Sequence, residues 1–208
     1  NNENKILFFD CGSKNSQLTA LLNRNLSLDR VPYNYKIGID EIKNNYSGIF
    51  ISNGPGNPEH LIELIELIKM VIKNDINIPI FGICLGHQVL GLAAGFKTLK
   101  LKYGNRGQNI PCGFINENNQ LTHRSIITSQ NHGYALENNN PDKWQVLFKN
   151  INDNSNEGIC HISKPFFSVQ FHPEARGGPE EANFLFDIFS NLVLQKKNIS
   201  NIINIFFI

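Results

Sequence analysis

Two patterns of apolar residues follow one another along the first half of the chain: short continuous apolar runs, and stretches with apolar residues at helical spacing. Four short runs rich in apolar and aromatic residues predict buried strands, at residues 5–10 (KILFFD), 31–37 (VPYNYKI), 48–52 (GIFIS) and 78–83 (IPIFGI). Stretches with apolar residues at helical spacing lie between them and predict helices, at residues 15–24, 40–45, 58–73 and 85–95. This alternation indicates an α/β fold, in which helices cover both faces of an open, mostly parallel sheet.

The second half of the chain follows a different pattern. Strand-like runs separated by Asn-rich loops predict strands at residues 96–101, 124–129, 144–148, 158–163 and 166–171. A closing helix is expected within residues 177–194, with Pro179 near its start and Glu180 and Glu181 in its first turn. No repeat or linker interrupts the pattern, so we expect one domain over residues 1–197 and a tail of uncertain structure at 198–208.

The net charge of the chain is too small to attract a polyanionic partner. Lys and Arg number 19 against 18 Asp and Glu, a formal net charge of +1, which argues against nucleic acid as a partner. No apolar run approaches the roughly 20 residues that span a bilayer, so no membrane association is expected. Any ligand must therefore be recognised by a local site.

The cysteines are scattered rather than clustered. Cys11, Cys84, Cys112 and Cys160 form no CxxC pair and no Cys/His set at zinc spacing, and no secretory leader precedes them. We therefore expect a cytoplasmic protein with reduced thiols and without a structural metal. The chain starts at Asn1 rather than Met and enters a strand almost at once, which indicates a piece of a longer polypeptide.

One cysteine stands between two glycines where an expected strand meets an expected helix. In FGICLGHQ, Cys84 has Gly82 and Gly86 on either side, as a tight nucleophile elbow requires. A thiol there would lie at the carboxyl edge of the sheet and at a helix N-terminus, which favours the thiolate. Taken alone, the string also fits a small apolar residue in the core.

A second motif supplies the groups that a nucleophilic cysteine needs. In QFHPEARGG, His172 and Glu174 follow the last expected strand, with Pro173 between them. A histidine can serve as base and a carboxylate can hold its imidazole, so Cys84, His172 and Glu174 make a complete set. The alternative is a surface turn without a role.

A third motif, SNGPGNPE, lies between a strand and a helix. Such loops leave backbone N–H groups free, and those of Gly56 and Leu85 could form an oxyanion hole. The alternative is an ordinary Gly-Pro turn.

Taken together, these motifs resemble the class I, or triad-type, glutamine amidotransferases over the whole chain. LKYGNRGQNIPC, TSQNHGYAL and QFHPEARGGPEEANFLFD resemble the small-subunit, or glutaminase, portion of glutamine-dependent carbamoyl phosphate synthetase more closely. GMP synthetases and anthranilate synthases share the elbow and HPE, but QNHGYA and GNRGQNIP are not expected in them. The resemblance implies a flavodoxin-like α/β sheet with additional β segments.

The resemblance also implies roles for individual residues. Cys84 would form a γ-glutamyl thioester, His172 would act as base and acid, and Glu174 would orient it. The positions that match glutamine-contacting residues are Gly54, Gly56, Leu85, Gln88, Asn131, Gly133 and Tyr134. No cofactor or metal is implied for this domain; ATP and a divalent metal belong to a synthetase partner. An amino-terminal small-subunit domain is not part of this sequence. Arg106 is expected to be a solvated charge or to face a partner.

Two other functions remain open. The chain could serve a different biosynthetic amidotransferase, or it could be a catalytically silent regulatory module bound to a synthetase. The sequence does not decide between pyrimidine and arginine synthesis, although the Asn-rich insertions favour the former weakly. Allosteric effectors, oligomeric state and fusion to the synthetase also stay open.

Overall fold

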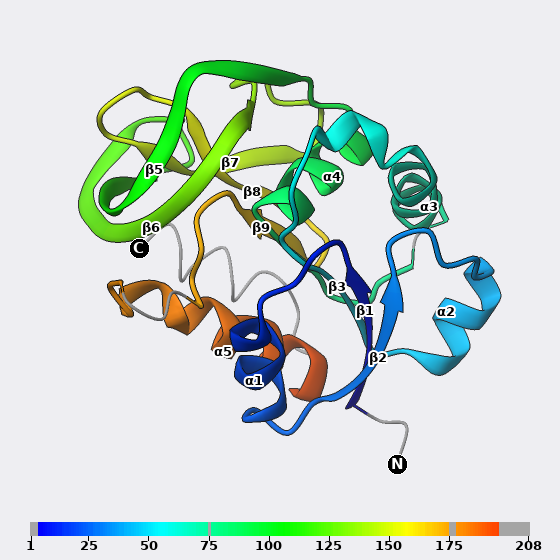
Figure 1. Ribbon diagram of the computed structural model, residues 1–208. Helices are drawn as coiled ribbons and strands as arrows, with labels where there is room; N and C mark the ends of the chain where they lie inside the picture. The colour runs from blue at the N-terminus through cyan, green and yellow to red at the C-terminus, as the bar shows by residue number, and fades with distance from the viewer. Residues whose placement is uncertain (1–3, 75, 175–177, 196–208) are drawn as a thin grey trace.

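A computed structural model describes residues 4–74, 76–174 and 178–195 (Figure 1). The strands are β1 (Lys5–Asp10), β2 (Ser27–Pro32), β3 (Gly48–Ile51), β4 (Ile80–Ile83), β5 (Thr98–Ile115), β6 (Leu121–Leu136), β7 (Trp144–Asn150), β8 (Asn156–His161) and β9 (Phe166–Val169). The α-helices are α1 (Asn15–Leu22), α2 (Ile39–Asn45), α3 (Ile62–Lys73), α4 (Leu85–Ala94) and α5 (Phe184–Gln195). Two 3₁₀ turns, η2 (Pro58–His60) and η3 (Glu181–Asn183), precede α3 and α5.

Within the described residues all the strands join one open sheet, in the order β2-β1-β3-β4-β9-β8-β7-β5-β6. Strands β2, β1, β3, β4 and β9 run parallel to one another. Strands β8, β7, β5 and β6 extend this parallel part by antiparallel pairing. The expected α/β fold with additional β segments is confirmed.

Helices cover both faces of the parallel part of the sheet. In β1, Ile6 and Phe8 point to one face and Leu7 and Phe9 to the other. Helices α1 and α5 pack on the first face, and α2, α3 and α4 pack on the second (Figure 1). Strands buried on both sides need apolar residues at every position, which explains the continuous apolar runs in the sequence.

Aromatic rings fix the two strands that lead into the site. Phe81 of β4 stacks on Phe167 of β9 with ring centroids 4.5 Å apart, and it meets Phe50 of β3 edge-on at 5.4 Å. All three side chains are buried. Burying one such ring contributes roughly 2–3 kcal/mol, so the ends of β4 and β9 are held firmly side by side.

The antiparallel part contains one long hairpin where the sequence predicted shorter strands. β5 begins at Thr98, within the predicted run at 96–101, and the run at 124–129 lies in β6; both strands continue through the polar segments between the predicted runs. Register shifts interrupt the pairing, for example between Lys100 and Asn105. Because much of this ribbon faces solvent, polar residues do not end its strands, and an apolar pattern cannot reveal its length.

Other boundaries also differ from the sequence prediction. The second strand is β2, not residues 31–37, since the chain turns after Pro32, where the N–H of Tyr35 donates to the Pro32 carbonyl at 3.0 Å. Asn57 caps as expected, with its side chain accepting from the Glu59 N–H at 3.1 Å, but it caps the turn η2, and α3 starts only at Ile62. Likewise the turn η3 precedes α5, so the closing helix begins at Phe184 rather than near Pro179.

None of the described helices is long and apolar enough to cross a membrane. The predicted tail at 198–208 and the predicted domain end at 197 lie outside the described residues.

Candidate active site

Cys84 occupies the turn between β4 and α4 in a backbone conformation that residues with side chains avoid. Its φ is 55° and its ψ is −102°. Two glycines permit this turn: a Cβ on Gly86 would lie 2.1 Å from the carbonyl oxygen of Ile51, and one on Gly82 would lie 2.5 Å from that of Gly86. The N–H of Cys84 donates to the Val169 carbonyl at 2.9 Å. The turn therefore holds the thiol at the carboxyl edge of the sheet, as expected.

His172 and Glu174 lie in the turn that follows β9. Nδ1 of His172 donates to Oε1 of Glu174 at 2.7 Å. Cys84 interacts with the same imidazole and helps to raise its pKa. Both side chains are almost completely buried, so the turn is not a bare surface feature. The N–H of His172 donates to the Ser129 carbonyl on β6 at 2.9 Å. The structure thus brings all three predicted catalytic residues together.

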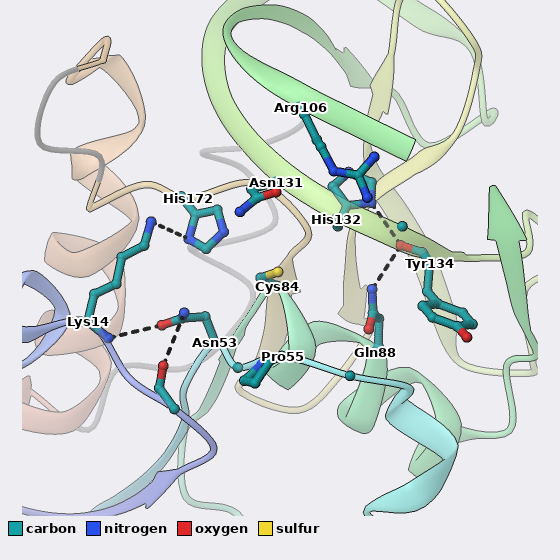
Figure 2. A pocket seen from close by; sticks show the side chains of 14 residues that line it. Lys14, Asn53, Pro55, Cys84, Gln88, Arg106, Asn131, His132, Tyr134 and His172 are labelled. Carbon is teal, nitrogen blue, oxygen red and sulfur yellow. Dashed lines mark hydrogen bonds between the residues drawn. The ribbon is translucent and has the colours of Figure 1, made fainter. Parts of the chain in front are cut away.

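A cavity of about 380 Å³ opens beside Cys84, and Figure 2 shows Cys84 at its centre between His172 and Gln88. Its lining consists of Gly12, Lys14, Asn53, Gly54, Pro55, Gly56, Cys84, Gln88, Arg106, Asn131, His132, Gly133, Tyr134 and His172. Its volume suits a small molecule. No acidic side chain is among these described lining residues, whereas Lys14 and Arg106 bring positive charge. The pocket therefore favours an anionic group on its ligand.

Six of the seven predicted substrate-contacting residues line this cavity: Gly54, Gly56, Gln88, Asn131, Gly133 and Tyr134. Leu85 is the exception, because its side chain is buried and packs against the backbone of Gly54. Only its backbone N–H, in the first turn of α4, could serve the pocket. Gly56 has φ +100°, with nothing within 4 Å of a would-be Cβ. The predicted oxyanion hole of Gly56 and Leu85 stays a prediction.

Comparison with known proteins identifies the family. The chain matches the model described as glutamine amidotransferase class-I over residues 7–192. The chain belongs to the class I glutamine amidotransferases.

The similar proteins include a carbamoyl phosphate synthase small chain and a multifunctional protein, and both are longer than this chain. The chain is 51% identical over 195 residues to the carbamoyl phosphate synthase arginine-specific small chain of Candida albicans, covering 93% of this chain and 44% of that protein. It is 51% identical over 186 residues to the multifunctional protein CAD of Squalus acanthias, covering 89% of this chain and 8% of that protein. The amidotransferase thus spans less than half the length of either relative.

A solved structure supports the fold independently. The glutamine amidotransferase of Methylobacillus flagellatus superposes on this chain with a TM-score of 0.68 at 12% identity, covering 92% of this chain and 93% of that one. At such low identity the likeness establishes the shared fold alone.

The surroundings of His172 and Glu174 in this amidotransferase shift the pKa of both side chains. Burial lowers the pKa of His172, but hydrogen bonds and charges from Cys84 and Glu174 outweigh burial and raise it to about 9. Burial raises the pKa of Glu174, and its hydrogen bond and ion pair with His172 more than reverse that effect. At neutral pH an imidazolium therefore lies between a carboxylate and the sulfur.

The remaining cysteines lie in surroundings that keep a thiol protonated. Burial, above all, raises the pKa of Cys11 and of Cys160 to about 12, and it raises that of Cys112 well above its usual value. All four cysteines are free. Among the described residues no group of three or more His, Cys, Asp or Glu side chains could hold a metal ion.

Lys14 is a residue of the site that the sequence did not single out. Its Nζ lies 3.5 Å from Nδ1 of His172 and 3.6 Å from Oε1 of Glu174 (Figure 2). Because the Nδ1 hydrogen points to Glu174, the lysine acts mainly on the carboxylate, whose pKa its charge helps to lower. The available signal was position, since Lys14 follows β1 at the same edge of the sheet as Cys84.

Proposed function

We propose that this domain hydrolyses L-glutamine to glutamate and ammonia through a thioester at Cys84. The observation that carries the proposal is the contact series from Glu174 to His172 to Cys84, at the wall of a cavity of small-molecule size. A silent regulatory module would have no need for an intact, buried series of this kind. The cytoplasm is the proposed location, since it keeps cysteine thiols reduced.

The reaction follows from the positions of these groups. The Cys84 thiolate attacks the carboxamide carbon of glutamine, and the C–S bond forms while the oxygen gains charge near the N–H groups of Gly56 and Leu85. His172 gives its proton to the nitrogen, the C–N bond breaks and ammonia leaves. His172 then takes a proton from water, which attacks the thioester, and glutamate leaves as the C–S bond breaks. No cofactor enters these steps.

The pocket also suits the α-carbon end of glutamine. The segment from Asn131 to Tyr134 forms one wall of the pocket, and the Gln88 side chain donates a hydrogen bond to its Tyr134 carbonyl at 2.8 Å. The cationic side chains of Lys14 and Arg106 favour the α-carboxylate by simple attraction. These features support the substrate roles assigned to Gly54, Gly56, Gln88, Asn131, Gly133 and Tyr134, with Leu85 contributing through its backbone.

The ammonia would pass to a carbamoyl phosphate synthetase domain or subunit, which combines it with bicarbonate. ATP and a divalent metal would act on that partner and not on this domain. Support comes from the relatives, whose names include both an arginine-specific small chain and the multifunctional protein CAD. Since both are 51% identical to the chain, the choice between arginine and pyrimidine synthesis stays open, as does fusion to the synthetase.

The decisive experiment labels the nucleophile in the complete assembly. A chloroketone analogue of glutamine should modify Cys84 alone, as read by mass spectrometry, and excess glutamine should block it. Cys84→Ser should abolish glutamine-dependent carbamoyl phosphate synthesis while synthesis from added ammonia persists. Labelling spread over Cys11, Cys112 and Cys160, or full glutamine-dependent synthesis by Cys84→Ser, would refute the proposal.

A further inference from the structure

We propose that Asn105 and Asp153 form a tether that positions one wall of the pocket for glutamine binding. The proposal rests on the proposed function. Nδ2 of Asn105 on β5 donates to Oδ2 of Asp153, in the turn between β7 and β8, at 3.0 Å. Neither residue is among the described residues that line the cavity beside Cys84. Both are therefore positioning residues, which act on glutamine through the residues next to them.

The wall in question is the part of the β5–β6 hairpin that closes the cavity on one side. The lining residues that belong to these two strands are Arg106, Asn131, His132, Gly133 and Tyr134. Figure 2 shows Arg106 and Asn131 above Cys84. Loops of the parallel part of the sheet supply other lining residues, among them Gly12, Lys14 and residues 53–56. The shape of the cavity therefore depends on where the hairpin lies relative to the parallel part.

Backbone pairing is interrupted at this wall. Residues 101–104 of β5 lie opposite residue 133 of β6 alone, because the register shifts there. Such a bulge leaves the extra residues outside the ladder, and only the Arg106 side chain is seen to brace it, with Nη1 donating to the Tyr103 carbonyl at 2.7 Å. The pairs that join β5 to β7 lie further along the strand, at residues 112–114. A contact from outside the hairpin therefore adds to the stability of the point where β5 rejoins β6, at Asn105.

Asp153 is a fixed anchor for that contact. Its Oδ1 accepts from the N–H of Ser155 at 2.9 Å and from the Ser155 hydroxyl at 2.6 Å, which leaves Oδ2 for Asn105. Burial raises the pKa of Asp153, but the hydrogen bonds from Ser155 and Asn105 outweigh burial and lower it. The carboxylate therefore stays charged at neutral pH. A hydrogen bond to a charged acceptor is stronger than one between neutral groups.

The tether reaches the pocket within one step of the ladder. Asn105 pairs with His132, and the next pair is Arg106 with Asn131. When the tether is broken, this part of the hairpin loosens, and glutamine must order Arg106 and Asn131 on binding, which lowers its affinity. The catalytic residues come from the junction of β4 with α4 and from the turn after β9, so the chemical step is affected less than binding.

The test exchanges the two side chains in the complete amidotransferase and synthetase assembly. Asn105→Asp sets two carboxylates against each other and should raise KM for glutamine about tenfold, with kcat and ammonia-dependent synthesis changed less than about threefold. Adding Asp153→Asn places an amide donor opposite the new carboxylate, so the double variant should return KM to within about threefold of wild type. Gln108→Glu is the control and should leave KM unchanged, since it adds the same charge at an exposed position of β5 that is not among the described lining residues.

Backbone hydrogen exchange gives a second readout that does not need activity. Exchange at residues 104–107 and 130–134 should be faster in Asn105→Asp than in the wild type, and the double variant should restore the wild-type rates. Unchanged KM or unchanged exchange in Asn105→Asp would overturn the positioning role. So would a double variant, or Gln108→Glu, with a KM as high as that of Asn105→Asp. A wild type that does not hydrolyse glutamine would instead overturn the proposed function, and the exchange rates would still test the tether.

Discussion

Nδ1 of His172 donates to Oε1 of Glu174 at 2.7 Å, inside a turn that is closed to solvent. With that nitrogen fixed on the carboxylate, the other ring nitrogen is left for Cys84. The carboxylate sets the tautomer of the imidazole and stabilises its positive charge, which is the role an orienting acid plays in a triad. The imidazole next to Cys84 is therefore oriented by a side chain that does not itself line the cavity.

The first prediction concerns this carboxylate. Glu174→Gln should lower kcat for glutamine hydrolysis by about 100-fold or more, because the amide keeps the size of the side chain but not its charge. The pKa of His172 should fall below about 9, since Glu174 supplies part of the raise. Steady-state kinetics and NMR titration of the imidazole measure both. Glu66→Gln, exposed on α3, is the matched control, and an unchanged pKa in Glu174→Gln would contradict the assignment.

The second prediction concerns stability and pH. His172 has a pKa of about 9 in the folded state against an ordinary value of 6.5. The folded state thus binds the extra proton, and the resulting stabilisation is complete below pH 6.5 and lost as pH rises through 9. The difference in unfolding free energy between wild type and His172→Gln should shrink by up to about 3 kcal/mol across that window. Urea denaturation at several pH values tests it, and a constant difference would show that the raised pKa is wrong.

The sequence was most informative where burial and function coincide. The elbow at Cys84 could be predicted because Gly82 and Gly86 have one purpose there, to let two backbones approach more closely than any side chain allows. The HPE turn could be predicted because His172 and Glu174 directly follow an apolar strand. In both cases the residue types that the site needs stand together in one short motif.

The sequence was least informative where partners come from distant segments. Lys14 reaches His172 across 158 positions of the chain. Its place after β1 indicates the edge of the sheet on which it lies, but not this partner. Glu157 is polar in sequence yet completely buried, and His132 comes within 3.7 Å of it only because β6 and β8 lie close together in the fold. The length of the β5–β6 hairpin was also hidden, since strands half open to solvent tolerate polar residues.

The third prediction concerns the elbow glycine inside α4. Helix propensity alone would favour alanine over glycine at Gly86 by about 1 kcal/mol. The new Cβ would, however, meet the Ile51 carbonyl at 2.1 Å, a backbone atom that cannot move away cheaply. Gly86→Ala should therefore lower the unfolding free energy by about 3 kcal/mol or more and slow alkylation of Cys84. Gly38→Ala is the control because nothing lies within 4 Å of its would-be Cβ, and equal stability of the two variants would contradict the close approach.

The last prediction separates the stability of the elbow from its chemistry. Cys84 holds φ at 55° and ψ at −102°, a conformation that costs roughly 1–3 kcal/mol for any residue with a Cβ. Cys84→Ala and Cys84→Gly both remove the sulfur, so both should lose glutamine hydrolysis. Only glycine adopts this backbone conformation without strain. The unfolding free energy of Cys84→Gly should therefore exceed that of Cys84→Ala by about 1 kcal/mol or more, despite the greater freedom of glycine in the unfolded chain. Chemical denaturation of the two variants side by side measures this difference. If alanine proves the more stable of the two, the strain is not stored at this residue, and the thiol is held in place by its contacts instead.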